Sequence, residues 1–552
     1  MKLSGGTFDF VIIGAGSAGS ILADRLTQDG TTTACVLEAG PWDKNPLIHI
    51  PAGFVKLNTH ADLTWPFASE PTELTAGRSI RLPQGKVVGG SSSINGMIYN
   101  RGQREDFDAW AEQGNPGWSF DDVLPYFKRS ERRIGAGDDE FRGRNGSLPV
   151  TNHDWHDPVC ERFIDGLQEL GIGRNPDYNG RQQEGAGYFQ RLILNGRRVS
   201  AARAFLHPAR RRQNLEVRTN VRVTRVLIED GRVVGVEYSN ERAPAIRTTV
   251  AVTREVVICA GTINTTQILQ LSGIGPGAAL QDLGVSVVRD LAGVGESLRD
   301  HYAVRIVAAA KNAGTINKSA RGLRLGREIA RWLIGKPSIL ALPPSLVHIF
   351  TRSPYATSRP DLQFVFTPGS YRAGKVYSLD RYPGMTCGFC QQRPESSGYV
   401  RLRSTDPFDS PIVQPNYLAS PLDQQIVVAG LKMVRGFLNT KTFAHYFDRE
   451  TLPGAAARSD EDLLDYARHY GITSFHFVGT AKMGPSTDPN AVVDSKLRVH
   501  GVTGLRVADA SVMPMITSAN TYAATLMIAE RAADFIRGTV VEAIVSRSPS
   551  AT

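Results

Sequence analysis

A single histidine in the last part of the chain has the chemistry of a proton acceptor. Residues 474–484 read SFHFVGTAKMG, so that His476 stands in an apolar setting shortly before Gly479. Such an imidazole can be a hydrogen-bonded core residue, a metal ligand, or a base that takes a proton from a substrate. No companion ligands stand at a suitable spacing, so the sequence predicts no metal site there. The choice between core residue and base depends on the rest of the chain.

The first 40 residues carry a glycine pattern that is typical of nucleotide binding. Residues 8–30, FDFVIIGAGSAGSILADRLTQDG, pass from an apolar run through Gly14, Gly16 and Gly19 into helical spacing. The first glycine allows a tight turn, the second lets the backbone approach a pyrophosphate, and the third lets helix pack on strand. Glu38 ends the next predicted strand, where a carboxylate accepts hydrogen bonds from ribose hydroxyls and repels a 2′-phosphate. This disfavours NADP and leaves NAD and FAD open.

The cysteines do not predict a redox or metal site. The chain has five of them, an odd and sparse set that does not indicate a disulfide framework. Cys387 and Cys390 form a C-x-x-C pattern, which can be redox-active or one half of a zinc site. Neither a second such pair nor a thioredoxin-like pattern accompanies it. We therefore interpret the two residues as buried thiols on a strand.

The chain is moderately basic, with a formal net charge of +9. Its densest basic run is 210–212, and no recognised nucleic-acid-binding module accompanies it. We expect a solvated helix end and no nucleic-acid partner, and contact with an anionic membrane stays open. No apolar run of about 18 residues predicts a spanning helix, and the N-terminal sequence enters a strand pattern with no room for a cleavable signal. These features predict a cytoplasmic protein, with peripheral membrane association as an option.

Two further glycine-rich segments complete a family pattern. Residues 85–102 read GKVVGGSSSINGMIYNRG, which suits a backbone pressed against a ligand, and residues 259–276 read CAGTINTTQILQLSGIGP. Together with the N-terminal glycines and HFVGTAKMG, these segments resemble the glucose–methanol–choline (GMC) family of FAD-dependent oxidoreductases. The resemblance extends from about Asp9 to about Ile536. In style it is nearest to members that oxidise aliphatic primary alcohols or choline.

The resemblance implies bound FAD and the residues that hold it. The residues implied for the ADP half are Gly14, Gly16, Ser17, Ala18, Gly19 and Glu38. Those implied for the isoalloxazine and pyrophosphate are Val88, Gly89, Ser92, Asn95, Gly96 and Met97. Val223 matches a backbone contact to adenine, and Asp509 and Ala510 match a second pyrophosphate contact. Ile94 stands where some members carry a histidine bonded to FAD, which implies a non-covalent cofactor.

The resemblance also implies a catalytic pair. His476 matches the active-site histidine, and Asn520 matches its usual partner, which is His or Asn in relatives. Residues 518–538, SANTYAATLMIAERAADFIRG, predict a helix that begins near Thr521, so Asn520 or Ser518 can also be its N-cap. The N-terminus of this helix is expected to face the flavin and to stabilise negative charge on the reduced ring. For His301, in GESLRDHY, we expect a structural role.

The expected fold is an α/β FAD-binding Rossmann-like domain interleaved with an α+β substrate domain built on an antiparallel sheet. The FAD-binding domain is predicted to comprise residues 1–155, 196–305 and 470–540, and the substrate-binding domain residues 156–195 and 306–469. Strand-like runs are DLQFVFTPG, CGFCQQRPESSGYVRLRS and PIVQPNYL, and QQIVVAGLKMVRGFLNT indicates an amphipathic helix. Residues 541–552 are expected to form a loose tail.

The function implied by the resemblance is oxidation of an alcohol to an aldehyde or ketone, by hydride transfer to flavin N5 with His476 as base. A dehydrogenase using a quinone or another non-oxygen acceptor is the preferred form, and the alternatives are an oxidase that makes hydrogen peroxide and a flavin-containing hydroxynitrile lyase. Phe477 and Tyr522 replace a frequent proline and asparagine of the family and are expected to reshape the substrate pocket.

Overall fold

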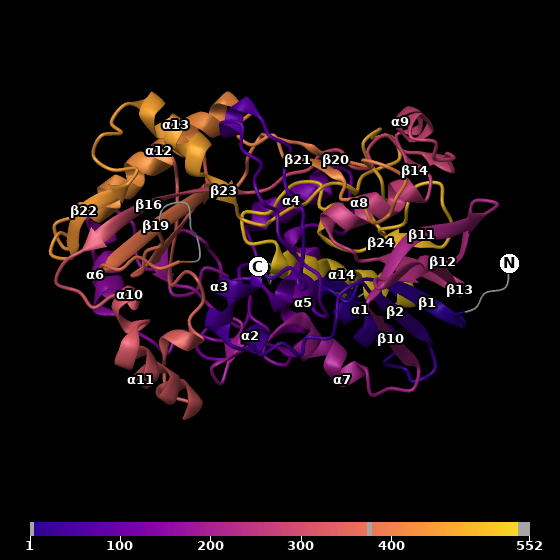
Figure 1. The fold of residues 1–552 in the computed structure, drawn as a ribbon, viewed down its shortest axis with the longest axis horizontal. Coiled ribbons are helices and arrows are strands. Elements are labelled where there is room, and N and C mark those ends of the chain that lie inside the picture. Colours follow the sequence, from indigo (N-terminus) through magenta and orange to yellow (C-terminus); the bar gives the residue numbers. More distant parts are fainter. Residues whose placement is uncertain (1–4, 373–377, 539–552) are drawn as a thin grey trace, which may run out of the picture.

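The computed structural model describes residues 5–372 and 378–538 (Figure 1). Two large sheets, each with a hydrophobic core of its own, build most of the molecule. In Figure 1 the strands of the first sheet lie on the right and those of the second on the left. The predicted tail, residues 541–552, lies outside the described residues.

The first sheet is mixed and contains the strands of the nucleotide-binding pattern. Its order is β10–β2–β1–β13–β12–β11, with β24 beside β13. The pairs β10–β2, β2–β1, β1–β13 and β13–β24 are parallel. The pairs β13–β12 and β12–β11 are antiparallel. The bounds are β1 Thr7–Ile13, β2 Ala34–Glu38, β10 Leu215–Thr219, β11 Val221–Glu229, β12 Arg232–Asn240, β13 Ala243–Ile258 and β24 Leu505–Val507. β2 is buried along its whole length, as is typical of a parallel strand covered on both faces.

Two helices fix the glycine-rich edge of this sheet. α1 (Ser17–Leu26) packs against α14 (Tyr522–Arg537), and buried Glu530 of α14 forms an ion pair with Arg25 of α1 at 2.8 Å. Separating one partner of a buried pair leaves an uncompensated charge, so the pair opposes sliding of one helix along the other. The pair ties the last turn of α1 to the middle of α14.

The second sheet is antiparallel throughout. Its order is β22–β16–β19–β18–β17–β7, with β23 beside β16. The bounds are β7 Gly185–Tyr188, β16 Tyr302–Ala310, β17 Val347–Thr351, β18 Leu362–Thr367, β19 Gly384–Gln391, β22 Phe447–Leu452 and β23 Ile472–Thr473. α12 (Pro421–Leu438) contacts β16 and β19. α6 (Pro158–Leu167) contacts α12 and β7, and α13 (Asp460–Tyr470) contacts α12.

The structure confirms the predicted helix as α12 and two of the strand-like runs as β18 and β19. The run PIVQPNYL contains β21 (Ile412–Gln414), which pairs with β20 (Tyr399–Arg401) in a separate two-stranded ladder and not in the large sheet. Both sheets draw strands from distant parts of the chain, and β23 joins the second sheet only after residue 470. The mixed and antiparallel sheets agree with the expected fold, and the domain boundaries stay a prediction.

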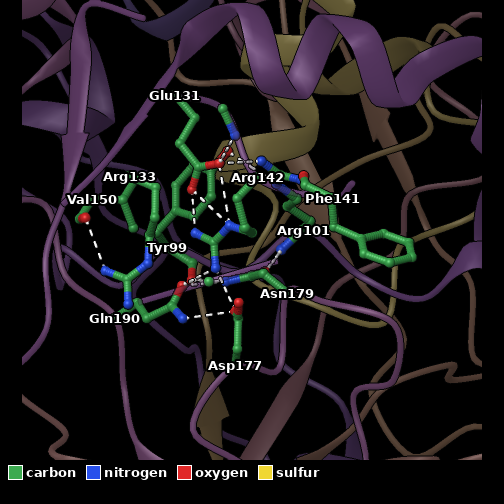
Figure 2. A network of polar contacts seen from close by, with 12 residues as sticks. Tyr99, Arg101, Glu131, Arg133, Phe141, Arg142, Val150, Asp177, Asn179 and Gln190 are labelled. Carbon is green, nitrogen blue, oxygen red and sulfur yellow. Dashed lines mark hydrogen bonds and ion pairs between the residues drawn. The ribbon is translucent and has the colours of Figure 1, made fainter. Parts of the chain in front are cut away.

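A buried ion network anchors the chain that leaves the second glycine-rich segment (Figure 2). The carboxylate of Glu131 accepts hydrogen bonds from Arg101, Arg142 and the amide of Gly143. Burial raises the pKa of Glu131, but the two guanidinium groups outweigh it and hold the pKa below its usual range. Because Arg101 lies four residues after Met97, the network fixes the exit of the 89–97 loop.

No helix within the described residues is long and apolar enough to cross a membrane.

Candidate active site

The N-terminal glycines form a cradle in which side chains have no room. Gly14 has a positive φ of 98°, and a Cβ atom there would lie 2.6 Å from the carbonyl oxygen of Cys259. At Gly19 a Cβ atom would lie 1.9 Å from the carbonyl oxygen of Gly14, so this glycine allows α1 to pack on β1. α1 begins after Gly16 with no side-chain cap, which leaves its first amides directed at the space in front of the helix.

The second glycine-rich segment closes over this cradle. Gly90 has a φ of 53°, and a Cβ atom there would lie 2.8 Å from Cα of Gly16. The amide of Gly89 donates to the carbonyl of Ala15 at 2.8 Å. The two backbones therefore touch, and the helix N-terminus and the 90–97 loop share one wall of a cavity.

Glu38 lies at the base of the cradle. One carboxylate oxygen accepts from the amide of Ala15 and the other from the amide of Gly40, both at 2.8 Å. Burial raises the pKa of Glu38, and although the two amide hydrogen bonds lower it, the pKa stays at about 7. Glu38 therefore shapes the cradle turn, and it also lines the cavity where a ribose contact is expected.

One cavity, with a volume of about 490 Å³, joins the cradle to His476. Most predicted site residues line it: Gly14, Gly16, Ser17, Ala18, Glu38, Ser92, Asn95, Gly96, Met97, Val223, His476, Asp509, Ala510, Asn520 and Thr521. Three predicted residues, Gly19, Val88 and Gly89, are not in its wall. They lie one layer behind it, where Gly19 packs α1 on β1 and the amide of Val88 donates to Pro41.

Asp509 organises the loops opposite the cradle. Its carboxylate accepts from the amide of Gly261 at 2.8 Å, from the hydroxyl of Thr265 at 2.6 Å and from the amide of Ser511 at 2.9 Å. The carboxylate is thus occupied by protein donors. Its clearest role in the structure is to join the segment at 259–276 to the loop before α14.

The N-cap interpretation of Asn520 and Ser518 is wrong. The cap of α14 is Thr521, and the helix begins at Tyr522. The hydroxyl of Ser518 donates to Asp106, and the amide of Asn520 lies 3.0 Å from Nε2 of His476. The structure therefore brings the predicted pair together, with Asn520 directed at the imidazole.

His476 has a second imidazole as its other neighbour. Nδ1 of His301 lies 2.9 Å from Nδ1 of His476, and Nε2 of His301 lies 2.8 Å from the carbonyl oxygen of Gln392. A carbonyl can only accept, so Nε2 of His301 carries the hydrogen. Burial lowers the pKa of His301 to about 4, which keeps it neutral at pH 7 and leaves Nδ1 as an acceptor.

This chain of hydrogen bonds assigns the tautomer of His476. Because Nδ1 of His301 accepts, Nδ1 of His476 must donate, and Nε2 of His476 is left with a lone pair. That lone pair faces Asn520 and the cavity. Burial, and then the neighbouring His301, hold the pKa of His476 well below its usual range, so it is neutral and able to accept a proton.

The backbone around His476 is braced by Asp300. Its carboxylate accepts from the amide of His476 at 2.7 Å and from the hydroxyls of Thr473 and Tyr417. Phe475 has a φ of 66°, a left-handed conformation that is costly for an aromatic residue. Asp300 thus holds a strained turn that directs His476 into the cavity.

Sequence reasoning missed the part that His301 has in this arrangement. The structure replaces its expected structural role with a direct contact to His476. The adjacent Asp300 and His301 hold the backbone and the imidazole of the same residue. The signal in the sequence was the pair of titratable residues in GESLRDHY, which lies far from His476 along the chain.

One face of the second sheet forms the opposite wall of the cavity. Cross-strand neighbours lie in rows, so Ala303, Cys390 and Gln363 form one row, in which Gln363 donates to Asn520 at 3.4 Å. The next row is Arg305, Gly388 and Val365. Alanine and glycine in these rows leave space above the sheet for a substrate.

The two cysteines of the C-x-x-C pattern are confirmed as buried free thiols on β19. Cys390 lines the cavity, whereas Cys387 packs in the hydrophobic core on the other face of the strand. Burial raises the pKa of the Cys390 thiol to about 12. Within the described residues no group of three or more potential ligands could hold a metal ion.

The substituted residues Phe477 and Tyr522 both line the cavity, as does Ile94. Phe477 packs in the core of the second sheet, and its carbonyl accepts from the hydroxyl of Thr262 at 2.7 Å. Phe477 thus joins the wall behind His476 to the helix that begins at Thr262, α8 (Thr262–Leu271).

Known proteins resemble this chain over its whole length. The family model described as GMC oxidoreductase matches residues 8–303 with its N-terminal part and 394–529 with its C-terminal part. An alcohol dehydrogenase [acceptor] of Pseudomonas putida is 38% identical over 96% of this chain and 95% of its own. An oxygen-dependent choline dehydrogenase of Brucella anthropi is 39% identical over the same shares.

The crystal structure of pyridoxine 4-oxidase from Mesorbium loti is also similar. It has a TM-score of 0.86 and 30% identity, and the match covers 95% of this chain and 98% of that one. The cradle, the paired imidazole and amide, and the two family-model matches agree, and the chain belongs to the GMC oxidoreductase family.

Proposed function

We propose that this protein oxidises the CH–OH group of an alcohol to an aldehyde or ketone with bound FAD. The observation that carries the proposal is the position of His476 and Asn520 at one end of a cavity whose other end is the glycine cradle. The cavity suits a dinucleotide because Gly14, Gly16 and Gly90 line it without side chains and the uncapped N-terminus of α1 presents its first amides there to a pyrophosphate.

FAD, when bound, supplies the acceptor for the hydride that leaves the alcohol carbon. Gly14, Gly16, Ser17 and Glu38 would hold its ADP half, and the 92–97 loop and Thr521 would lie beside the ring. The uncapped N-terminus of α14 favours negative charge in front of it.

The chain itself handles the hydroxyl proton. In the structure Nδ2 of Asn520 and Nε2 of His476 are in direct contact at 3.0 Å. A substrate hydroxyl that takes the place of this contact donates to Nε2 of His476 and accepts from Nδ2 of Asn520. His476 takes the proton from oxygen as the C–H bond to the same carbon breaks, and a carbonyl results. Asn520 stabilises the negative charge that develops on the oxygen. His301 keeps the accepting nitrogen of His476 free of hydrogen.

The test of this assignment uses two histidine variants. His476→Ala removes the base and is expected to lower the rate of anaerobic flavin bleaching by alcohol by about 10²–10⁴-fold while FAD stays bound. His469→Ala, at an exposed position on α13, is the matched control and should keep the wild-type rate. Undiminished bleaching in His476→Ala refutes the base, and purified protein without flavin absorbance refutes the cofactor.

We propose that the cofactor is held without a covalent bond. The cavity position of Ile94 offers a hydrocarbon side chain, which cannot attack the flavin ring. Denaturation in acid should release all yellow colour into the supernatant, and colour retained in the protein pellet contradicts this.

For the electron acceptor we propose a quinone or another non-oxygen acceptor. The relative from Pseudomonas putida is named an alcohol dehydrogenase [acceptor], which supports a dehydrogenase, whereas the pyridoxine relative is named an oxidase. Turnover with a soluble quinone and little peroxide in air is expected. Peroxide formed in proportion to alcohol consumed would decide for the oxidase, and cyanohydrin cleavage without bleaching would decide for the lyase.

The charge of the cavity favours an uncharged alcohol. Among the described lining residues the only carboxylates are Glu38 and Asp509, and both accept hydrogen bonds from the protein near the cradle. On the substrate side the charged residue is Arg305, which repels a cation such as choline. We therefore propose a neutral alcohol as substrate, although several relatives are named choline dehydrogenases.

A further inference from the structure

Helix α11 (Gly322–Leu333) is amphipathic with its apolar side turned outward. A surface helix normally buries its apolar stripe and leaves its polar side in water. Here the described residues of α11 include none that is buried, and the partly covered ones are Leu325, Glu328, Arg331 and Trp332. In Figure 1 the helix lies at the edge of the molecule, away from both large sheets.

Polar groups attach α11 to the rest of the chain. The carboxylate of Glu328 accepts from the amide of Ile339 at 3.0 Å, and the carbonyl of Glu328 accepts from the hydroxyl of Ser338 at 2.8 Å. The indole of Trp332 donates to the carbonyl of Gly196 at 2.8 Å. These contacts hold Glu328 and Trp332 against the rest of the chain, so the side of the helix that faces outward is set by the fold.

The outward side is rich in large apolar side chains. Leu323 is 96% exposed, Leu333 70% and Ile334 68%. At 3.6 residues per turn, these residues and Ile329 fall on one continuous arc of the helix. Scattered exposed apolar residues are ordinary, but a contiguous arc on one helix marks an interaction surface.

Cations surround this apolar arc. A groove of about 630 Å³ at the start of α11 is lined by Lys318, Arg321, Arg324 and Arg381, and none of the described residues that line it is acidic. Arg327 lies exposed one turn after Leu323. Arg321 donates to the carbonyl of Asp380 at 2.8 Å, which holds the groove in shape. Apolar side chains beside a groove of cations are complementary to acyl chains below anionic headgroups.

We propose that α11 docks this protein on an anionic lipid surface. Leu323, Leu333 and Ile334 enter the boundary between headgroups and acyl chains, and the cationic groove binds lipid phosphates. The segment differs from the basic run at 210–212, which the sequence indicated as the option for membrane contact. The proposal does not depend on the chemistry proposed for His476.

The chain that follows α11 leads to the wall of the cavity. After α11 the chain passes through Ile339–Ala341 to Pro344, which lines the cavity. A Cβ atom at Gly96, in the predicted flavin loop, would lie 2.8 Å from Pro344.

Vesicle flotation of the holoenzyme tests the proposal. The wild-type protein should float with phosphatidylcholine vesicles that contain phosphatidylglycerol, and less with phosphatidylcholine alone or at high salt. The double variant Leu323→Glu with Leu333→Glu should lower the partition coefficient by at least about tenfold. The variant Arg324→Glu with Arg327→Glu should lower it by a similar factor and remove the dependence on phosphatidylglycerol.

Matched controls separate the site from general charge and hydrophobicity. Arg211→Glu with Arg242→Glu changes the net charge by the same amount at exposed positions elsewhere, and Ile246→Glu replaces another exposed apolar residue. These variants should bind vesicles as the wild type does. Flavin content and alcohol oxidation in solution should be unchanged in all of them.

Two outcomes overturn the proposal. One is a wild-type protein that fails to float, or α11 variants that float as well as the wild type. The other is a wild-type dimer in solution that Leu323→Glu with Leu333→Glu converts to a monomer without any vesicle binding, which would make this face an interface between two copies.

Discussion

The contact between His301 and His476 gives the sharpest test of how the base is prepared. We consider the substitution His301→Leu, which keeps an apolar volume in the buried site and removes the acceptor for Nδ1–H of His476. The companion substitution His301→Asn retains an acceptor, because the side-chain oxygen of asparagine takes about the place of Nδ1 of histidine. The two variants thus separate the hydrogen bond from the filling of space.

The size of the effect follows from the tautomer. A buried donor left without a partner costs roughly 1–3 kcal/mol. In His301→Leu this cost falls on the tautomer of His476 that has its lone pair on Nε2, so the imidazole shifts toward the tautomer with hydrogen on Nε2. Since about 1.4 kcal/mol corresponds to tenfold, we expect flavin reduction by alcohol to slow by about 10–100-fold. His301→Asn should recover most of the rate.

The assay is anaerobic stopped-flow bleaching of the flavin over a range of pH. In His301→Leu the acid limb of the profile should move to lower pH, because protonated His476 also carries Nδ1–H and loses the acceptor that neutral His301 supplies. Flavin content and the thermal midpoint provide the check on folding. A wild-type rate and pH profile in His301→Leu would refute the tautomer argument, as would an equal loss of rate in His301→Asn.

Acid sensitivity, substrate charge and the glycine cradle each give a further measurable outcome. Burial lowers the pKa of His301 to about 4 and of His348 to about 3, so the unfolded chain binds protons that the folded chain does not. The free energy of unfolding should therefore fall as the pH drops from about 6.5 to about 4, and His301 alone contributes about 3 kcal/mol to this loss. A urea unfolding midpoint that does not change over that pH range would contradict this. Choline should bleach the flavin at least about tenfold more slowly than its neutral analogue 3,3-dimethylbutan-1-ol. Arg305→Ala should reduce this difference in rate. Equal rates for the two alcohols in the wild type would refute the charge argument. Gly19→Ala places a Cβ atom 1.9 Å from a backbone oxygen and should lower the FAD content and the thermal stability. In the control Gly436→Ala the added Cβ atom meets nothing within 4 Å, so neither quantity should change. A Gly19→Ala protein with a full complement of FAD would show that the cradle tolerates a side chain.

Local patterns predicted the cradle well because its constraints are local. The turn at Gly14 and the close packing at Gly19 depend on neighbours within one strand–helix unit, and the glycine spacing records them directly. The helix near Thr521 was predicted for the same reason. Its N-cap, Thr521, lies one position after Asn520, one of the two predicted cap residues. Pairing of His476 with Asn520 came from the family resemblance, and the structure places the two side chains together.

The remaining features depend on tertiary contacts that no short pattern records. His301 contacts His476, and the carbonyl of Gln392 accepts from His301, although the three residues lie far apart in the sequence. A buried histidine has the same local sequence whether or not it contacts another imidazole. The position of Arg305 in the cavity wall follows from its register with Gly388 across β16 and β19. The periodicity of α11 would indicate an ordinary surface helix, and the exposure of Leu323, Leu333 and Ile334 shows that large apolar side chains face outward.

The nature of the partner of His476 bears on how the proposed alcohol oxidation would proceed. A carboxylate on Nδ1 would stabilise the protonated imidazole and raise its pKa. Asp300 lies next to His301 in sequence, yet its carboxylate binds the backbone amide of His476 and leaves the imidazole to a neutral partner. His476 is therefore oriented without being made strongly basic. An isolated proton transfer from a hydroxyl to so weak a base is unfavourable. It becomes favourable as the hydride departs, since loss of hydride makes the hydroxyl far more acidic. The uncharged pair of imidazoles thus favours loss of the proton together with the hydride over a stable alkoxide formed beforehand.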